Sequence, residues 1–223
     1  MDLTRTEFNF RFPLKIHGLC KCFKYWRSKE LNRPEFIPPE KLGFDIDGVV
    51  ADTMDAFIRI ACSEYGINHL EKEDITSYWL EDCLPVPAET VTAIVNRLLA
   101  DPLGVSLKPI SGAGEALTEL AGQALLTFVT ARPVKEPIEK WLSTILQGVP
   151  LQRINVIATG HHSAKGQVLR DLGIRYFVED HLETCQELFD MGIGSIVFDQ
   201  PWNRKYTPYL RVRSWTEIMA LIR

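Results

Sequence analysis

From Lys41 onward, short apolar runs alternate with longer stretches in which apolar residues recur every three or four positions. Short runs are typical of buried strands, and the longer periodicity is typical of amphipathic helices. The runs predict strands at residues 42–46, 124–129, 153–157, 175–178, 195–198 and 209–212. The periodicity predicts helices at 134–147, 163–172 and 181–191, and the capping box Ser214-x-x-Glu217 predicts a final helix. This alternation favours a parallel sheet covered by helices on both faces.

One interval breaks the alternation. About eighty residues separate the first predicted strand from the second, with helical patterns at 53–65, 88–100 and 112–122. This is too long for one crossover connection, so we expect a small helical insertion at residues 66–108, placed as a lid over the carboxyl edge of the sheet. The predicted fold is α/β, a Rossmann-like three-layer core formed by residues 41–65 and 109–223, with a small helical cap inserted after the first strand.

The composition changes this picture little. With 46% hydrophobic residues, 24% charged residues and a net charge of −4, the chain gives no general reason to expect a nucleic-acid or membrane partner. No apolar run approaches the roughly 20 residues of a membrane span, and the N-terminus lacks the apolar core of a secretory signal. Five scattered cysteines, an odd number, fit reduced thiols, so we expect a cytoplasmic protein. The oligomeric state stays open.

Residues 1–40 form a distinct extension, in which basic residues outnumber acidic ones by eight to five and aromatic residues are interleaved. It either packs on the body or is partly disordered, or it is an arm that contacts a partner or nucleic acid. A zinc site at His17, Cys20 and Cys22 is a further interpretation, although the C-x-C spacing is atypical and no second pair follows.

The first strand carries the most unusual polar pattern. The stretch GFDIDGVVAD places Asp45 and Asp47 at alternate positions of an otherwise apolar run. An unpaired buried carboxylate costs several kcal/mol or more, so such groups are protonated, paired or bound to a metal. Gly48 permits a tight turn directly after the pair. We expect Asp52 to cap the helix that begins at Thr53 rather than to contact a ligand.

Three later junctions place polar side chains at the same edge of the predicted sheet. Thr130-Ala131-Arg132 follows the second strand, Lys165 opens a helix, and Glu179-Asp180 ends the fourth strand. Ligands bind at the carboxyl ends of the strands in such sheets. Mg²⁺ prefers carboxylates, waters and substrate phosphate, and hydroxyl and backbone N–H groups suit phosphate oxygens. An aspartate is also a known nucleophile toward phosphate, and a second carboxyl can move the proton. The pattern therefore indicates Mg²⁺-dependent phosphoryl transfer.

These motifs resemble the haloacid dehalogenase-like hydrolase superfamily over residues 42 to about 222. They stand here, in order, as FDIDGVVADT, VTARP, the lysine of SAKGQ, and VEDHLE. The resemblance implies that Asp45 is the nucleophile, Asp47 the general acid and base, and Lys165 a group that steadies both Asp45 and the phosphate. It further implies phosphate binding at Thr130, Ala131, Arg132 and Lys165, and Mg²⁺ binding by Asp45, Asp180, Glu179 and the backbone carbonyl of Asp47.

Within that superfamily the motifs are most similar to the 5′-nucleotidase and deoxyribonucleotidase branch, which also has a loop like Gln200-Pro201-Trp202-Asn203 near its site. Members that cleave carbon–halogen bonds need no acid at the position of Asp47, which favours phosphoryl chemistry here. The expected activity is a Mg²⁺-dependent phosphatase acting on small phosphomonoesters, with nucleoside monophosphates as candidates. The alternatives are a phosphotransferase, a sugar or metabolite phosphatase, and a catalytically weak phosphate-binding regulatory protein.

Several side chains keep two interpretations. Arg132 either reaches the phosphate or forms a surface ion pair, and Glu179 binds the metal directly or through water. His161 and His162 either contact substrate or are bystanders in a loop. Tyr78 and Trp79 either stack on a base or pack within the cap.

Overall fold

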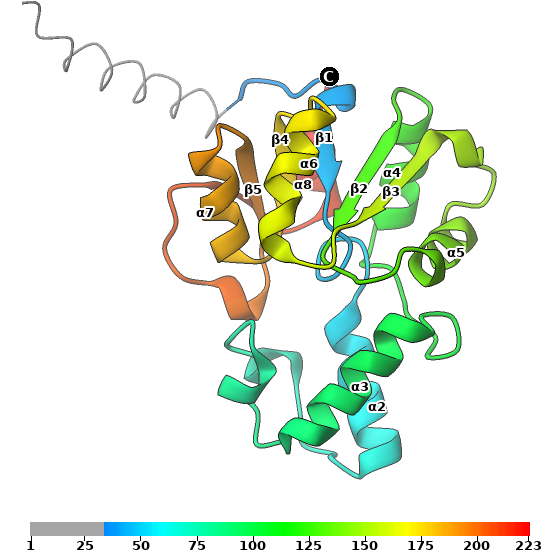
Figure 1. The fold of residues 1–223 in the computed structure, drawn as a ribbon, viewed down its shortest axis with the longest axis vertical. Coiled ribbons are helices and arrows are strands. Elements are labelled where there is room, and N and C mark those ends of the chain that lie inside the picture. Colours follow the sequence, from blue (N-terminus) through cyan, green and yellow to red (C-terminus); the bar gives the residue numbers. More distant parts are fainter. Residues whose placement is uncertain (1–33) are drawn as a thin grey trace, which may run out of the picture.

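The computed structural model describes residues 34–223, so the predictions for the N-terminal extension, including its zinc interpretation, lie almost wholly outside the described residues. All six predicted strands are present. They form one parallel sheet in the order β3-β2-β1-β4-β5-β6 (Figure 1). The strands are β1 (Leu42–Phe44), β2 (Leu126–Thr130), β3 (Ile154–Ala158), β4 (Tyr176–Glu179), β5 (Gly194–Phe198) and β6 (Leu210–Val212).

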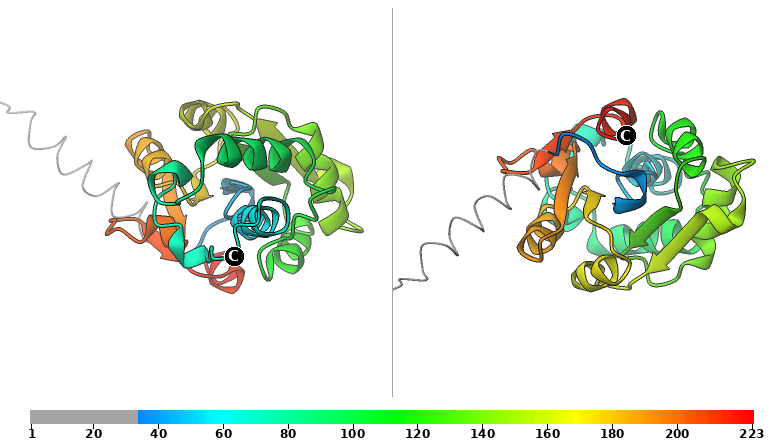
Figure 2. Two further views of the ribbon diagram at one scale, coloured as in Figure 1. Left: turned by 90° about the horizontal axis from the view of Figure 1, so that it is seen from below. Right: turned by 90° about the horizontal axis from the view of Figure 1, so that it is seen from above.

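Helices cover both faces of this sheet, which confirms the predicted three-layer α/β fold. Helices α4 and α8 lie on one face, and α6 and α7 lie on the other (Figure 2). The helices that accompany the sheet are α4 (Ala113–Ala121), α5 (Glu136–Ile145), α6 (Lys165–Asp171), α7 (Leu182–Asp190) and α8 (Trp215–Ala220). The side chain of Ser214 accepts the N–H of Glu217, as the predicted capping box requires.

Two strands each have one end that differs from the prediction by two residues, whereas every other strand end lies within one residue of it. β1 stops at Phe44 rather than at residue 46, because the carbonyl of Ile46 already accepts the N–H groups of Val50 and Ala51 in a tight turn. The N–H of Asp45 still donates to Val178, so the pairing with β4 continues one residue further. β2 begins at Leu126 rather than at residue 124, since Ala124 is still bonded to the last turn of α4.

The interval between β1 and β2 is largely helical, as predicted. Helix α2 (Thr53–Tyr65) leaves the sheet and lies beside α3 (Ala88–Ala100), with the short 3-10 turns η2 (Lys72–Asp74) and η3 (Leu80–Asp82) between them in the chain (Figure 1). Buried side chains recur at helical spacing on α3, namely Val91, Ile94 and Leu98, and they belong to the same buried apolar cluster as the sheet core. Asp52 caps α2, because its side chain accepts the N–H of Asp55, and this confirms the predicted role.

Residues late in the chain fasten the loop that follows β1. Gln200 donates through Nε2 to the carbonyl of Gly48 at 2.7 Å, and Trp215 donates through Nε1 to the carbonyl of Val49 at 3.0 Å. Gly48 itself has φ +73°, and a Cβ atom there would lie 2.1 Å from Oδ2 of Asp180. The loop is therefore held at a fixed, close distance from the end of β4.

Among the described residues, none of the helices has the length and apolar character needed to cross a membrane.

Candidate active site

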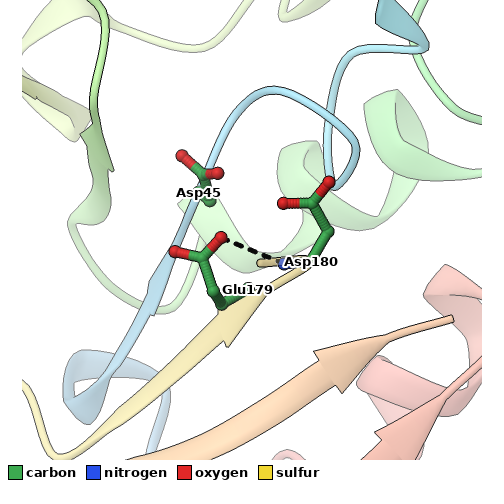
Figure 3. Close-up of side chains that lie close together, drawn as sticks. All are labelled: Asp45, Glu179 and Asp180. Carbon is green, nitrogen blue, oxygen red and sulfur yellow. Dashed lines mark hydrogen bonds between the residues drawn. The ribbon is translucent and has the colours of Figure 1, made fainter. Parts of the chain in front are cut away.

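Three buried carboxylates meet where β1 and β4 end side by side. Asp45 follows β1, while Glu179 and Asp180 stand at the end of β4 (Figure 3). One oxygen from each carboxylate lies within 4.8 Å of the others, and none of the three residues is more than 3% exposed. The predicted carboxyl-edge cluster is thus formed, and so many buried negative charges need compensation.

Lys165 supplies part of that compensation. Its side chain is fully buried at the start of α6, with Nζ 2.9 Å from Asp45 and 2.8 Å from Glu179. Burial by itself would lower the pKa of Lys165, but the charges of Asp45 and Glu179 outweigh it and raise the pKa above its usual value. The lysine therefore stays protonated and bridges the two strand ends.

Both carboxylate oxygens of Glu179 accept hydrogen bonds from within the chain. Its Oε2 accepts from Lys165, and its Oε1 accepts the backbone N–H groups of Asp180 and His181 at 3.1 Å each. Burial alone would raise the pKa of Glu179, but the charge of Lys165 and these hydrogen bonds lower it. Both oxygens already have partners within the chain, which favours an indirect contact of Glu179 with a metal over a direct one.

Asp180 is the least compensated member of the cluster. Its Oδ2 accepts from Nε1 of Trp202 at 3.0 Å, whereas its Oδ1 is buried and has no hydrogen-bond partner among the described residues. Burial, followed by the negative charges of Glu179 and Asp45, raises the pKa of Asp180. Burial and Glu179 likewise raise the pKa of Asp45. An orphaned carboxylate oxygen beside two further acids fits a hard divalent cation such as Mg²⁺.

Asp47 has different surroundings, although it lies only two residues from Asp45. Arg132 holds both of its oxygens, with Nε 2.9 Å from Oδ2 and Nη2 2.8 Å from Oδ1, and Thr53 donates through Oγ1 at 2.6 Å. Burial alone would raise the pKa of Asp47, but the charge and hydrogen bonds of Arg132 lower it. The alternative of a surface ion pair for Arg132 is wrong, because this side chain is buried and only 3% of the residue is exposed.

The sheet edge and the helical unit enclose a cavity of about 350 Å³. Asp45, Asp47, Asp180 and the predicted phosphate-binding residues Thr130, Ala131 and Arg132 line its sheet side. Oγ1 of Thr130 also accepts the backbone N–H of Arg132 at 3.2 Å, which fixes the turn after β2. The structure thus brings predicted residues of three chain segments to one cavity, and Nζ of Lys165, from the fourth segment, lies 2.9 Å from Asp45.

The opposite wall of the cavity is largely apolar and comes from the inserted unit. It includes Tyr78, Trp79, Leu80, Val91, Val95, Leu98 and Leu99. The hydroxyl of Tyr78 lies 3.2 Å from Nε2 of His162, and its ring is centred 4.0 Å from that of His181. Burial, then the charge of Lys165, lowers the pKa of His162 to about 4, so this imidazole is neutral at neutral pH. Aromatic contacts therefore join the insertion to the core beside the acidic cluster.

The structure distinguishes the two histidines for which a substrate contact was considered. His162 lines the cavity, whereas its neighbour His161 is exposed and is not among the lining residues.

The contact of Thr53 with Asp47 was not predicted from the sequence. A threonine at the start of a helix is common, and nothing in the local pattern distinguishes one that faces a carboxylate.

Comparison with solved structures finds the same fold in hydrolases of low sequence identity. A haloacid dehalogenase-like hydrolase from Streptococcus pneumoniae is 13% identical, with a TM-score of 0.52 over 80% of this chain and 96% of that one. A haloacid dehalogenase superfamily hydrolase of subfamily IA from Geobacter sulfurreducens is 19% identical, with a TM-score of 0.52 over 82% and 95% of the two chains.

Sequence comparison is more specific. A nucleotidase from Clostridium acetobutylicum is 25% identical over 181 residues, which span 80% of this chain and 91% of that protein. Residues 40–223 match the family described as 5′ nucleotidase, deoxy (pyrimidine), cytosolic type C protein. The chain therefore belongs to this family of haloacid dehalogenase-like nucleotidases and is a phosphoric monoester hydrolase.

Proposed function

We propose that this protein is a Mg²⁺-dependent phosphatase that hydrolyses small phosphomonoesters through a phosphoaspartate on Asp45, with nucleoside monophosphates as its substrate class. The observation that carries the proposal is the arrangement of Asp45 and Asp47 on one cavity wall. One carboxylate lies against a lysine and two acids, and the other is held by an arginine. Two carboxylates with separate surroundings suit two separate roles.

In the first step, an oxygen of Asp45 forms a bond to phosphorus while the bond from phosphorus to the ester oxygen breaks. Asp47 takes up a proton from the monoanionic ester on binding and gives that proton to the departing oxygen, which leaves as an alcohol. In the second step, Asp47 takes a proton from water, the water oxygen bonds to phosphorus, and the bond to Asp45 breaks to release phosphate. Lys165 remains protonated throughout and steadies Asp45 and the phosphoryl oxygens.

Asp45, Asp180 and the backbone carbonyl of Asp47 would hold Mg²⁺, with Glu179 beside them. When bound, the ion supplies positive charge that offsets the phosphate and the clustered acids. Thr130 and the backbone of Ala131 lie on the same cavity wall and are suited to the remaining phosphate oxygens.

The opposite wall supports the substrate class. Tyr78 and Trp79 present aromatic surface to the cavity, and apolar side chains of α3 continue it. An aromatic base attached to a phosphorylated sugar is complementary to such a wall. Membership of a nucleotidase family and the match to the Clostridium acetobutylicum nucleotidase support the same substrate class.

Cys62, Cys83 and Cys185 are free thiols, which supports a cytoplasmic location.

The full chain should release inorganic phosphate from an aryl phosphate in the presence of Mg²⁺, and Asp45→Asn should reduce this release to background. Wild-type turnover by Asp45→Asn would refute the phosphoaspartate. A panel of ribonucleoside and deoxyribonucleoside monophosphates and sugar phosphates should then reveal a nucleotide preference. A flat profile would overturn the substrate class while leaving the phosphatase proposal intact. Phosphate recovered on an added alcohol rather than in water would identify a phosphotransferase.

A further inference from the structure

Arg132 connects two parts of the molecule through one guanidinium group. Two of its nitrogens donate to the carboxylate of Asp47, at 2.9 and 2.8 Å. Its third nitrogen, Nη1, lies 3.3 Å from the carbonyl oxygen of Leu98 and 3.4 Å from that of Leu99. The guanidinium therefore spans from the carboxylate of the sheet edge to the end of helix α3 in the inserted unit.

Both carbonyls belong to the last turn of α3, which ends at Ala100. The last four carbonyls of a helix lack partners within the helix and carry partial negative charge. A buried guanidinium satisfies them and is attracted to this end of the helix. A planar fork with five N–H donors can serve a carboxylate and two carbonyls together, which a lysine ammonium cannot do with the same geometry.

Helix α2, which packs beside α3, reaches the same carboxylate. Thr53, the first residue of α2, donates its hydroxyl to Oδ1 of Asp47 at 2.6 Å. Helices α2 and α3 pack side by side. Asp47 is thus contacted from α2 directly and from α3 through Arg132, so its orientation depends on where this helical pair sits.

We propose that Arg132 is a positioning residue that ties the carboxylate of Asp47 to the C-terminal end of α3, so that the proton-transfer group is aimed correctly only when the helical insertion is in place over the cavity. This inference rests on the proposed function, in which Asp47 protonates the departing oxygen. It assigns Arg132 to Asp47 and to α3, rather than to the phosphate itself.

The leaving group of the substrate can distinguish a role of Arg132 in positioning Asp47 from a role in binding the phosphate. An alkyl phosphate needs a proton on its departing oxygen, whereas an aryl phosphate such as p-nitrophenyl phosphate has a leaving group that departs without one. The ratio kcat/KM covers the chemical steps up to departure of that group. A misdirected Asp47 therefore lowers kcat/KM for the alkyl ester and spares the aryl ester, while a lost phosphate contact lowers both.

The test compares Arg132→Lys with wild type and with Arg97→Lys, in which an exposed arginine of helix α3, paired with Glu64, is replaced. We expect Arg132→Lys to lower kcat/KM for an alkyl phosphomonoester by about 10²-fold and for p-nitrophenyl phosphate by less than threefold. Inhibition by inorganic phosphate should not change. In an Asp47→Asn background, Arg132→Lys should add little further loss, because residues that act as a unit are not additive.

Equal losses for both esters, with weaker inhibition by phosphate, would overturn the proposal and assign the guanidinium to the phosphate. Equal losses that match the fraction of unfolded protein would reduce Arg132 to a structural residue. Absence of phosphatase activity in the wild-type protein, or full phosphatase activity in Asp45→Asn, would instead refute the proposed function on which the inference rests.

Amide hydrogen exchange tests the connection to the insertion. Removal of the guanidinium leaves the carbonyls of Leu98 and Leu99 without this donor, so the last turn of α3 should exchange faster in Arg132→Lys than in Arg97→Lys. Unchanged exchange there would overturn the tie to α3.

Discussion

Asp45 and Asp47 lie two positions apart in the chain, yet their surroundings are opposite in character. Around Asp45, three buried carboxylates share the charge of Lys165, and burial together with Glu179 raises the pKa of Asp45. Around Asp47, a single carboxylate receives a complete guanidinium fork and a hydroxyl, and its pKa is lowered. The region of Asp45 holds more negative than positive charge and is suited to a cation, whereas the carboxylate of Asp47 is already neutralised and is suited to holding one orientation.

The difference follows from where the partners come from. The region of Asp45 is built from the ends of β1 and β4 and the start of α6, which are parts of the sheet core. The region of Asp47 draws on the loop after β2, on the start of α2 and on the end of α3. The same two-residue step in sequence thus passes from a rigid charge cluster to a contact that spans two parts of the fold.

The largest effect should come from breaking the region of Asp45. Lys165→Met leaves two buried carboxylates without their cation, so the free energy of unfolding should fall by about 3–5 kcal/mol. Urea denaturation measures this loss. Lys135→Met is the matched control, because Lys135 is exposed and pairs with Glu139 at 3.0 Å on the surface of α5, and its loss should cost less than about 1 kcal/mol. Equal losses in the two variants would contradict the contrast between buried and exposed pairs.

The next effect should come from binding of Mg²⁺ to the region of Asp45. At a concentration 100 times its Kd, Mg²⁺ should stabilise wild type by about 2.7 kcal/mol and raise its Tm, whereas Asp180→Asn should show little change. Thermal unfolding with and without Mg²⁺ measures the difference. An unchanged Mg²⁺ shift in Asp180→Asn would exclude this carboxylate as a ligand.

This stabilisation should also depend on pH. A carboxyl group with a raised pKa in the folded state binds its proton more tightly there than in the unfolded chain. Without metal, stability should therefore fall as pH rises from the ordinary carboxyl range through the raised pKa values of Asp45 and Asp180. The Tm increase produced by Mg²⁺ should be larger at pH 8 than at pH 5, and a larger increase at pH 5 would contradict the assignment.

The smallest effect should come from the region of Asp47, where Arg132 and Thr53 both donate hydrogen bonds to the same carboxylate. Thr53→Val removes one hydrogen bond to a charged group, which should cost about 1.5 kcal/mol, because Arg132 still holds both carboxylate oxygens. Thr53→Ser keeps the hydroxyl and is the matched control. Urea denaturation of both variants decides the question, and equal stability of Val and Ser at this position would argue against the hydrogen bond.

Much of the fold could be predicted because it depends on local periodicity. The apolar runs identified all six strands, and the acidic, hydroxyl and lysine positions at the strand ends identified the cavity. The side-chain partners could not be predicted in the same way. Arg132 lies 85 positions from Asp47, and the two side chains meet only because β1 and β2 are neighbours in the folded sheet. The early end of β1 was also missed, because it depends on which backbone N–H groups bond the carbonyl of Ile46, and the residue types do not determine this.

The bonds that fasten the loop after β1 also have a consequence for the order of folding. Gln200 and Trp215 lie 152 and 166 positions beyond the carbonyls that they hold. Contacts of such long range form late, because closure of a long loop is entropically costly. A growing chain exposes Asp45 and Asp47 long before it acquires the residues that set their loop, which lie 152 and 166 positions beyond the carbonyls that they hold. Catalytic competence would then be gained in one late event, so appearance of activity during refolding would report completion of the whole sheet rather than formation of its first strands.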